Sequence, residues 1–258
     1  MSHRINLASA AVLAVVGLAA CSDSSGPASA GKTVAFQLAT RQAGAAPAIR
    51  GAGLLAGTET IGLGNDTIVL SSVQVVLRRI ELNRVNGSAC DSLTTDDSCE
   101  ELKAGPVLLD LPLGAGAART FSVAIDTGSY DKLEFKVHAP ESSNDAAFIA
   151  QYPDFEEVSI RATGTWNGTP FTYTSDLDVE QEINLVPPIT VTDAAGANLT
   201  LFVDLGTWFA NQSNTGLINP ADANKGGSAE GEVKSNIETS LNAFEDNDRD
   251  GGDDHGSN

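Results

Sequence analysis

The sequence predicts a mainly β protein, an antiparallel β-sandwich of roughly nine strands with one C-terminal amphipathic helix. Apolar and polar residues alternate through most of the chain, as at Leu133, Phe135 and Val137, which is the period of a half-buried strand. The alternating runs are short and are separated by turn signals, of which Asn167-Gly168 is the strongest. Helical spacing of apolar residues appears only near the C-terminus. These observations indicate a sandwich or an open barrel, and we take the sandwich.

Residues 1–20 predict a lipoprotein signal peptide. Arg4 precedes an apolar run that ends in small residues and is too short to span a membrane as a helix. The closing motif LAAC resembles the bacterial lipobox, which implies that Cys21 becomes the lipidated N-terminus; an ordinary signal beside a cysteine is the alternative. Ser22 after this cysteine implies the outer membrane by the sorting pattern of bacterial lipoproteins. Residues 21–32, small and polar, predict the lipidated cysteine and a flexible tether.

Residues 33–225 are expected to form the sandwich. The apolar alternation slips by one position at Arg78-Arg79, which predicts a β-bulge, although the two arginines could also bind an anion. Pro187-Pro188 must break a strand or place it at a sheet edge. The predicted strands cover residues 34–38, 72–85, 107–111, 121–125, 133–137, 179–191 and 198–209, with a hairpin at 159–175.

The hairpin has a register that follows from its turn. A two-residue Asn-Gly loop pairs Trp166 with Thr169. The same register pairs Gly164 with Phe171, Ala162 with Tyr173 and Ile160 with Ser175. The apolar side chains then share one face, which makes Trp166 a predicted core residue.

Residues 226–245 predict a helix that docks on the sandwich. Val233, Ile237, Leu241 and Phe244 fall at i, i+4, i+8 and i+11 and form one narrow apolar stripe. A helix this short needs tertiary packing to be stable.

Residues 246–258 form an acidic tail that begins like a calcium loop. Asp246, Asp248 and Asp250 occupy positions 1, 3 and 5, and Asp254 occupies position 9. Position 12 is Ser257 rather than a bidentate glutamate, so we expect at most weak Ca²⁺ binding. A solvated tail without a metal is the alternative.

Cys90 and Cys99 bracket one acidic loop and are expected to form a disulfide, because an exported protein meets an oxidising environment. Metal binding by the pair is the alternative, but it would need further cysteines or histidines nearby, and the sequence has none there. The net charge of −19 argues against nucleic acid as a partner. The membrane is expected as a partner through the lipid anchor alone.

The inventory of reactive residues argues against an enzyme. After signal removal only His138, on the wet face of a strand, and His255 remain, and no catalytic or phosphate-binding motif occurs. Neighbouring acids such as Glu156-Glu157 are expected by chance in so acidic a chain. Trp208-Phe209, Tyr152 and Phe155 could form an aromatic platform for a glycan, although core packing of these side chains is preferred.

Several stretches resemble a group of bacterial lipoproteins that carry a β-sandwich domain of unknown function, similar to the prealbumin-like extracellular modules. The stretches are DTIVLSSVQVVLRRIEL, GPVLLDLPLG, FSVAIDTGSYDKLEFKV, GTWNGTPFTYTSDL, NLTLFVDLGTWF, LINPADANKGG and NIETSLNAFEDNDRDG. The resemblance spans most of residues 33–250 and implies a fold and a surface location but no reaction. We therefore expect a lipid-anchored protein of the bacterial cell envelope with a structural or interaction role, or alternatively a carbohydrate- or protein-binding module, with calcium as a possible aid.

Overall fold

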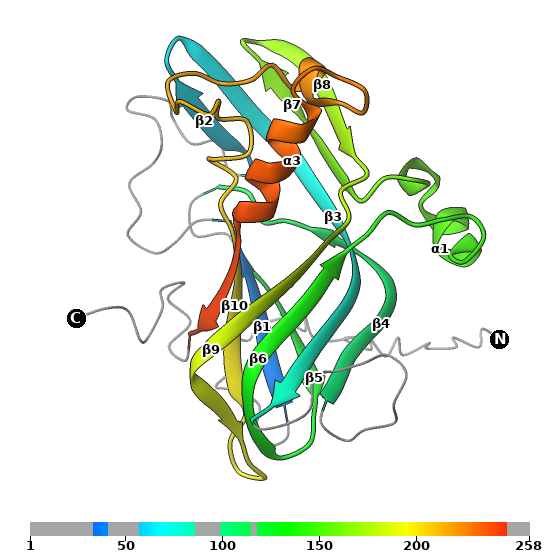
Figure 1. The fold of residues 1–258 in the computed structure, drawn as a ribbon, viewed down its shortest axis with the longest axis vertical. Helices are drawn as coiled ribbons and strands as arrows, with labels where there is room; N and C mark the ends of the chain where they lie inside the picture. The colour runs from blue at the N-terminus through cyan, green and yellow to red at the C-terminus, as the bar shows by residue number, and fades with distance from the viewer. Residues whose placement is uncertain (1–32, 41–56, 86–98, 115–117, 247–258) are drawn as a thin grey trace, which may run out of the picture.

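The computed structural model describes residues 33–40, 57–85, 99–114 and 118–246, and these form a sandwich of two β-sheets with few helices (Figure 1). One sheet has four strands in the order β11-β10-β1-β5. The other has seven, five of them in the order β8-β7-β3-β6-β9, with β2 and β4 also paired to β3. The predicted fold class is confirmed. The described residues contain eleven strands rather than nine, because β2 and β11 were not expected.

The four-stranded sheet consists of β1 (Thr33–Ala39), β5 (Ala118–Ala124), β10 (Ala197–Val203) and β11 (Leu241–Glu245). Its central pair, β1 and β10, is parallel, with Val34 opposite Ala197, whereas the flanking pairs are antiparallel. The first described strand therefore lies in the middle of its sheet and is hydrogen-bonded on both sides.

The seven-stranded sheet is organised by β3 (Asp66–Arg84), a strand of 19 residues. The first half of β3 lies between β2 (Glu59–Leu63) and β7 (Ile160–Trp166). Its second half lies between β4 (Cys99–Asp110) and β6 (Gly128–Val137). The outer neighbours are β8 (Thr169–Ser175) beside β7 and β9 (Val179–Val191) beside β6.

The β-bulge predicted at Arg78-Arg79 is confirmed. The register of β3 shifts between Leu77 and Arg79 against both β4 and β6. The extra residue restores the alternation, so that Leu77, Ile80 and Leu82 are all buried. Pro187 and Pro188 lie in β9, which is an edge strand, as expected.

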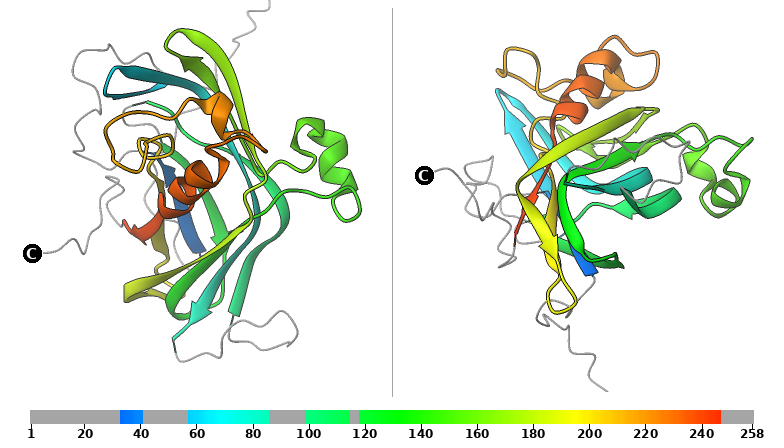
Figure 2. Two further views of the ribbon diagram at one scale, coloured as in Figure 1. Left: turned by 45° about the horizontal axis from the view of Figure 1, so that its top comes forward. Right: turned by 60° about the horizontal axis from the view of Figure 1, so that its bottom comes forward.

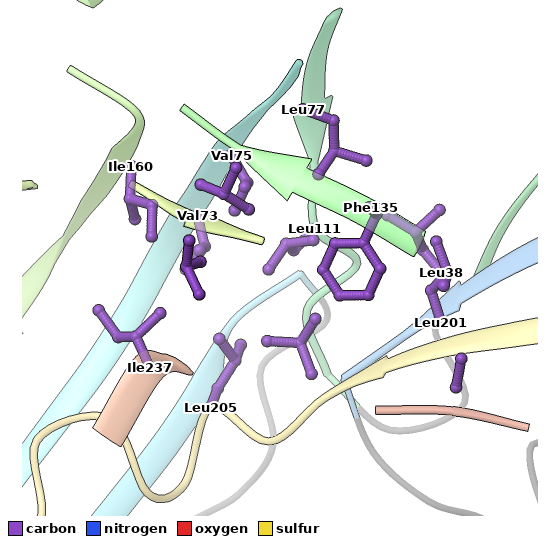
Figure 3. Packing of buried hydrophobic residues seen from close by; sticks show 14 of the residues in the cluster. Leu38, Val73, Val75, Leu77, Leu111, Phe135, Ile160, Leu201, Leu205 and Ile237 are labelled. Atoms are coloured by element: carbon purple, nitrogen blue, oxygen red, sulfur yellow. The ribbon is translucent and has the colours of Figure 1, made fainter. Parts of the chain in front are cut away.

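The core lies between the sheets and continues under helix α3 (Figure 3). Phe135 and Leu77 of the large sheet meet Leu38 and Leu201 of the small sheet at one end. At the other end Ile237 of α3 and Leu205 face the large sheet in place of small-sheet strands. A small cavity of about 40 Å³ remains between the sheets, lined mainly by apolar side chains.

The β7–β8 hairpin has the predicted register, from Trp166 opposite Thr169 to Ile160 opposite Ser175. Gly164 is required in it, because a Cβ there would lie 2.0 Å from the carbonyl oxygen of Val69 on β3. Ile160 and Tyr173 are fully buried, but Trp166 is only partly buried and packs at the margin of the core. The prediction that Trp166 is a core residue therefore needs correction, because it lies at the turn end of the hairpin, at the margin of the core.

The C-terminal helix is shorter than predicted. Helix α3 (Glu230–Thr239) ends before Ser240, and the residues that follow form β11. Leu241, expected on the helical stripe, instead pairs with Val203 of β10. Backbone hydrogen bonds to the edge of the small sheet override the helical spacing here. The remaining helices are α1 (Ala146–Gln151), the 3-10 helix η1 (Pro153–Phe155) and α2 (Pro220–Ala223). Within the described residues, none of the helices has the length and apolar character needed to cross a membrane.

Candidate functional site

A polar pocket of about 440 Å³ lies beside the end of β6 and the start of β9. One wall is an excursion of the chain, residues 138–159, that connects β6 to β7 and carries α1 and η1. Figures 1 and 2 show this excursion projecting from the body of the sandwich in all views. The pocket is lined by His138, Ala139, Glu141, Ser142, Ser143, Glu157, Asp176, Asp178 and Lys225.

The excursion is fixed at its base. The Asp145 carboxylate forms an ion pair with Arg78 of the β3 bulge and accepts a hydrogen bond from the Glu141 backbone N–H at 3.1 Å. The Glu157 backbone N–H donates to the carbonyl oxygen of Pro140 at 2.9 Å, which joins the two ends of the excursion. Arg78 is thus paired with a carboxylate of the protein, and Arg79 is paired with Glu81 at 3.1 Å and Glu180 at 2.9 Å, which leaves no support for the arginine pair as an anion site.

The excursion contributes little to the core. Helix α1 has no buried residue, and the buried apolar side chains of this segment are Pro140 and, in η1, Phe155. What the segment does build is a wall of the pocket.

Asp176 lies at the base of the pocket between two lysines. Its carboxylate is 2.6 Å from Lys234 Nζ and 3.1 Å from Lys225 Nζ. The hydrogen bond from Lys234, supported by Lys225, lowers the pKa of Asp176 below its ordinary value. Burial lowers the pKa of Lys234, but the hydrogen bonds to Asp176 and Glu230 outweigh burial and raise it. These ion pairs tie α3 to the end of β8.

Lys225 is positioned by its neighbour Asn224. The Asn224 Oδ1 accepts a hydrogen bond from the Thr174 backbone N–H at 2.9 Å, and its Nδ2 donates to the Thr172 carbonyl oxygen at 3.4 Å. The side-chain amide thereby occupies positions on the edge of β8 that a neighbouring strand would occupy. The hydrogen bond to Asp176 raises the pKa of Lys225.

On the opposite side of the pocket, His138 Nδ1 lies 3.2 Å from Asp178. Lys136 Nζ is 3.6 Å from the same carboxylate. His138 follows β6 directly, and its side chain is 28% exposed, so it lies in the pocket wall rather than on an open strand face. Glu141 accepts from Ser143 and Asn144 at 3.4 Å, and Glu157 is 3.9 Å from Lys225.

The alternative interpretation of an aromatic platform is not supported. Trp208 and Phe209 are fully buried, and Phe155 is 3% exposed. Trp208 Nε1 donates to Ser240 Oγ at 2.9 Å, and Phe209 packs edge-on against Tyr173. Tyr152 is partly exposed but stacks against Phe148 on the excursion. The preferred reading of these residues as packing side chains therefore holds for all but Tyr152.

Other predicted site residues lie mostly outside the described residues: Cys21, Cys90, Asp248, Asp250 and Asp254. Cys99 begins β4, opposite Asn83. Asp246 is buried, and its carboxylate accepts a hydrogen bond from Thr200 Oγ1 at 2.7 Å. In the part of the chain that the structure describes, no three His, Cys, Asp or Glu side chains are grouped so as to hold a metal ion.

The fold and site define a mainly β, two-sheet protein with a polar pocket beside the sandwich. The sequence matches no protein-family model and no curated protein. Its structure resembles that of MbnP from Methylosinus trichosporium at 12% sequence identity and a TM-score of 0.40, with 83% of this chain and 98% of that chain covered.

Proposed function

We propose that this chain is a lipid-anchored protein of the bacterial cell envelope, at the outer membrane, with a non-enzymatic interaction role. In this proposal the sandwich is a binding module of the prealbumin-like lipoprotein type. The binding site is the polar pocket beside the excursion, and it takes a small polar ligand.

The observation that carries the binding role is the pocket itself. A segment that adds little to the core is held against the sandwich by Arg78 and by its own backbone, and it borders an open pocket whose volume falls in the range of small-molecule sites. Its lining side chains come from connections on a rigid β scaffold, which is where binding residues are most often found.

The position of the first strand is consistent with an anchored module. Thr33 lies against Gly196 in the turn between β9 and β10, since a Cβ on Gly196 would lie 2.3 Å from the Thr33 carbonyl oxygen. The pocket lies at the other end of β9, about 40 Å away along a strand of 13 residues. A tether of residues 22–32 reaches at most about 40 Å. The β9–β10 turn would then face the membrane that holds the lipid on Cys21, and the pocket would be directed away from that membrane.

Labelling with radioactive palmitate tests the anchor. The parent protein should incorporate the label and sediment with membranes, whereas Cys21→Ser should lose the label. Ser22→Ala keeps the cysteine and should stay labelled. Label retained by Cys21→Ser would contradict the anchor.

The calcium-assisted version of this function rests on the acidic tail. Because Asp246 is buried against Thr200, a chain ending at residue 246 keeps β11 and removes the rest of the motif. Calorimetry with Ca²⁺ should show heat that is lost in this truncated chain and in Asp248→Ala. Equal titrations of all three proteins would show that the acidic tail is solvated and does not bind Ca²⁺.

A further inference from the structure

We propose that the pocket recognises a neutral, hydroxyl-rich molecule, that is a saccharide, through carboxylate oxygens. This inference rests on the proposed function of the pocket as a small-ligand site, and it names the chemical class of the ligand.

The residues that line the pocket exclude two other classes of ligand, anions and apolar molecules. Four carboxylates against one lining lysine would repel phosphate or another anion. An apolar ligand would find almost no apolar wall, because Ala139 is the only hydrophobic side chain among the described residues that line the pocket.

Two of the four carboxylates are compensated by lysines of the protein, which weakens the main reason to expect a cation. Asp176 is paired with Lys234 and Lys225, and Asp178 lies within 3.6 Å of Lys136 and 3.2 Å of His138. A neutral ligand brings no charge of its own into the pocket. An ammonium group or a metal ion would have to give up its own hydration on entering, which is costly.

Hydroxyl groups of a ligand match the hydrogen-bonding capacity that the pocket lining has left. Each carboxylate can accept more hydrogen bonds than the one or two it already receives, because its two oxygens offer about four lone-pair positions. Ser142 and Ser143 of the excursion and the Lys225 ammonium group add donors to the lining of the pocket. A hydroxyl group both donates and accepts, so adjacent hydroxyls of a sugar ring fit a lining that offers both acceptors and donors.

Glu157 and Glu141 are the residues that test this arrangement. Both belong to the excursion and their polar contacts are long, 3.9 Å to Lys225 for Glu157 and 3.4 Å to Ser143 for Glu141. Glu156 provides a matched control, because it is the exposed neighbour of Glu157, carries the same charge and does not line the pocket.

The experiment is calorimetric titration of the full-length protein with neutral mono- and disaccharides of glucose, galactose and mannose, and with 1,4-diaminobutane and inorganic phosphate. At least one saccharide should bind, with an affinity that stays the same when NaCl is raised about tenfold, because a neutral ligand is not screened. Glu157→Gln and Glu141→Gln should each weaken this binding about tenfold, since each loses a hydrogen bond to a charged acceptor. Glu156→Gln should bind as the parent does.

The possible failures are distinguishable. Binding of 1,4-diaminobutane alone, lost in Glu157→Gln but not in Glu156→Gln, would overturn the saccharide inference and keep the pocket as the site. Saccharide binding that is unchanged in Glu157→Gln and Glu141→Gln would overturn this location. If none of the probes binds the parent protein, both the inference and the small-ligand function are overturned. Thermal unfolding of each variant establishes that it is folded.

Discussion

Replacing Asp176 with Asn should lower the free energy of unfolding by about 1–3 kcal/mol at neutral pH, the range for hydrogen bonds to charged groups at a partly exposed site. The Asp176 carboxylate receives Lys234 at 2.6 Å and Lys225 at 3.1 Å. Its side chain is 26% exposed, so solvent screens part of this attraction. Asn keeps the size of the side chain but removes its charge. Lys234 keeps its ion pair with Glu230 at 2.6 Å in the variant, which limits the loss of stability.

The effect depends on pH in a direction that follows from the pKa of Asp176. The lysine hydrogen bonds lower this pKa in the folded protein below the ordinary value of 3.8. A carboxyl group of this kind stabilises the fold above its ordinary pKa, and the stabilisation is lost as the pH falls through the folded pKa. The difference between parent and Asp176→Asn should therefore be constant above about pH 5 and shrink below about pH 4.

Urea unfolding followed by tryptophan fluorescence measures this difference, because Trp208 is fully buried and is hydrogen-bonded to Ser240 at the end of α3. Asp154→Asn is the control. Its carboxylate is 71% exposed and 3.8 Å from Arg161, so its loss should change stability by less than about 0.5 kcal/mol. Equal stabilities for the two variants at neutral pH would refute the reasoning, and so would a difference that grows on acidification.

Three further predictions concern the rest of the sandwich. Asn224→Ala should destabilise the protein by about 1–3 kcal/mol and promote self-association, measured by urea unfolding and light scattering, because it uncovers the β8 edge; a variant that remains monomeric would contradict the edge argument. Trp208→Ala should cost about 3–5 kcal/mol in urea unfolding and Trp166→Ala clearly less, since only Trp208 is fully buried; equal costs would contradict the assigned burial. Mass spectrometry without reduction should find Cys90 and Cys99 joined, and two free thiols in protein from the periplasm would rule out the bridge.

Local sequence determined the features that depend on neighbours in the chain. The Asn-Gly turn sets the register of the β7–β8 hairpin, because positive φ angles at Asn167 and Gly168 allow only a tight connection. The slip in alternation at Arg78-Arg79 locates the bulge, because a strand with one buried face must keep its apolar side chains on that face.

Tertiary contacts decided what neighbours in the chain could not. The spacing of Val233, Ile237, Leu241 and Phe244 fits a longer helix, but the free edge of β10 turns the last part into β11. In the sequence, Glu156-Glu157 are expected as chance neighbours and His138 is expected on the wet face of a strand. The sequence therefore did not predict that these residues lie at or beside one pocket. The absence of period-two alternation over residues 139–159 was the available signal that this segment leaves the sheet. His138, Asp178 and Lys225 meet only because β6, β8 and β9 bring distant connections together, and the hydrogen bonds and ion pairs that hold them there join residues tens of positions apart.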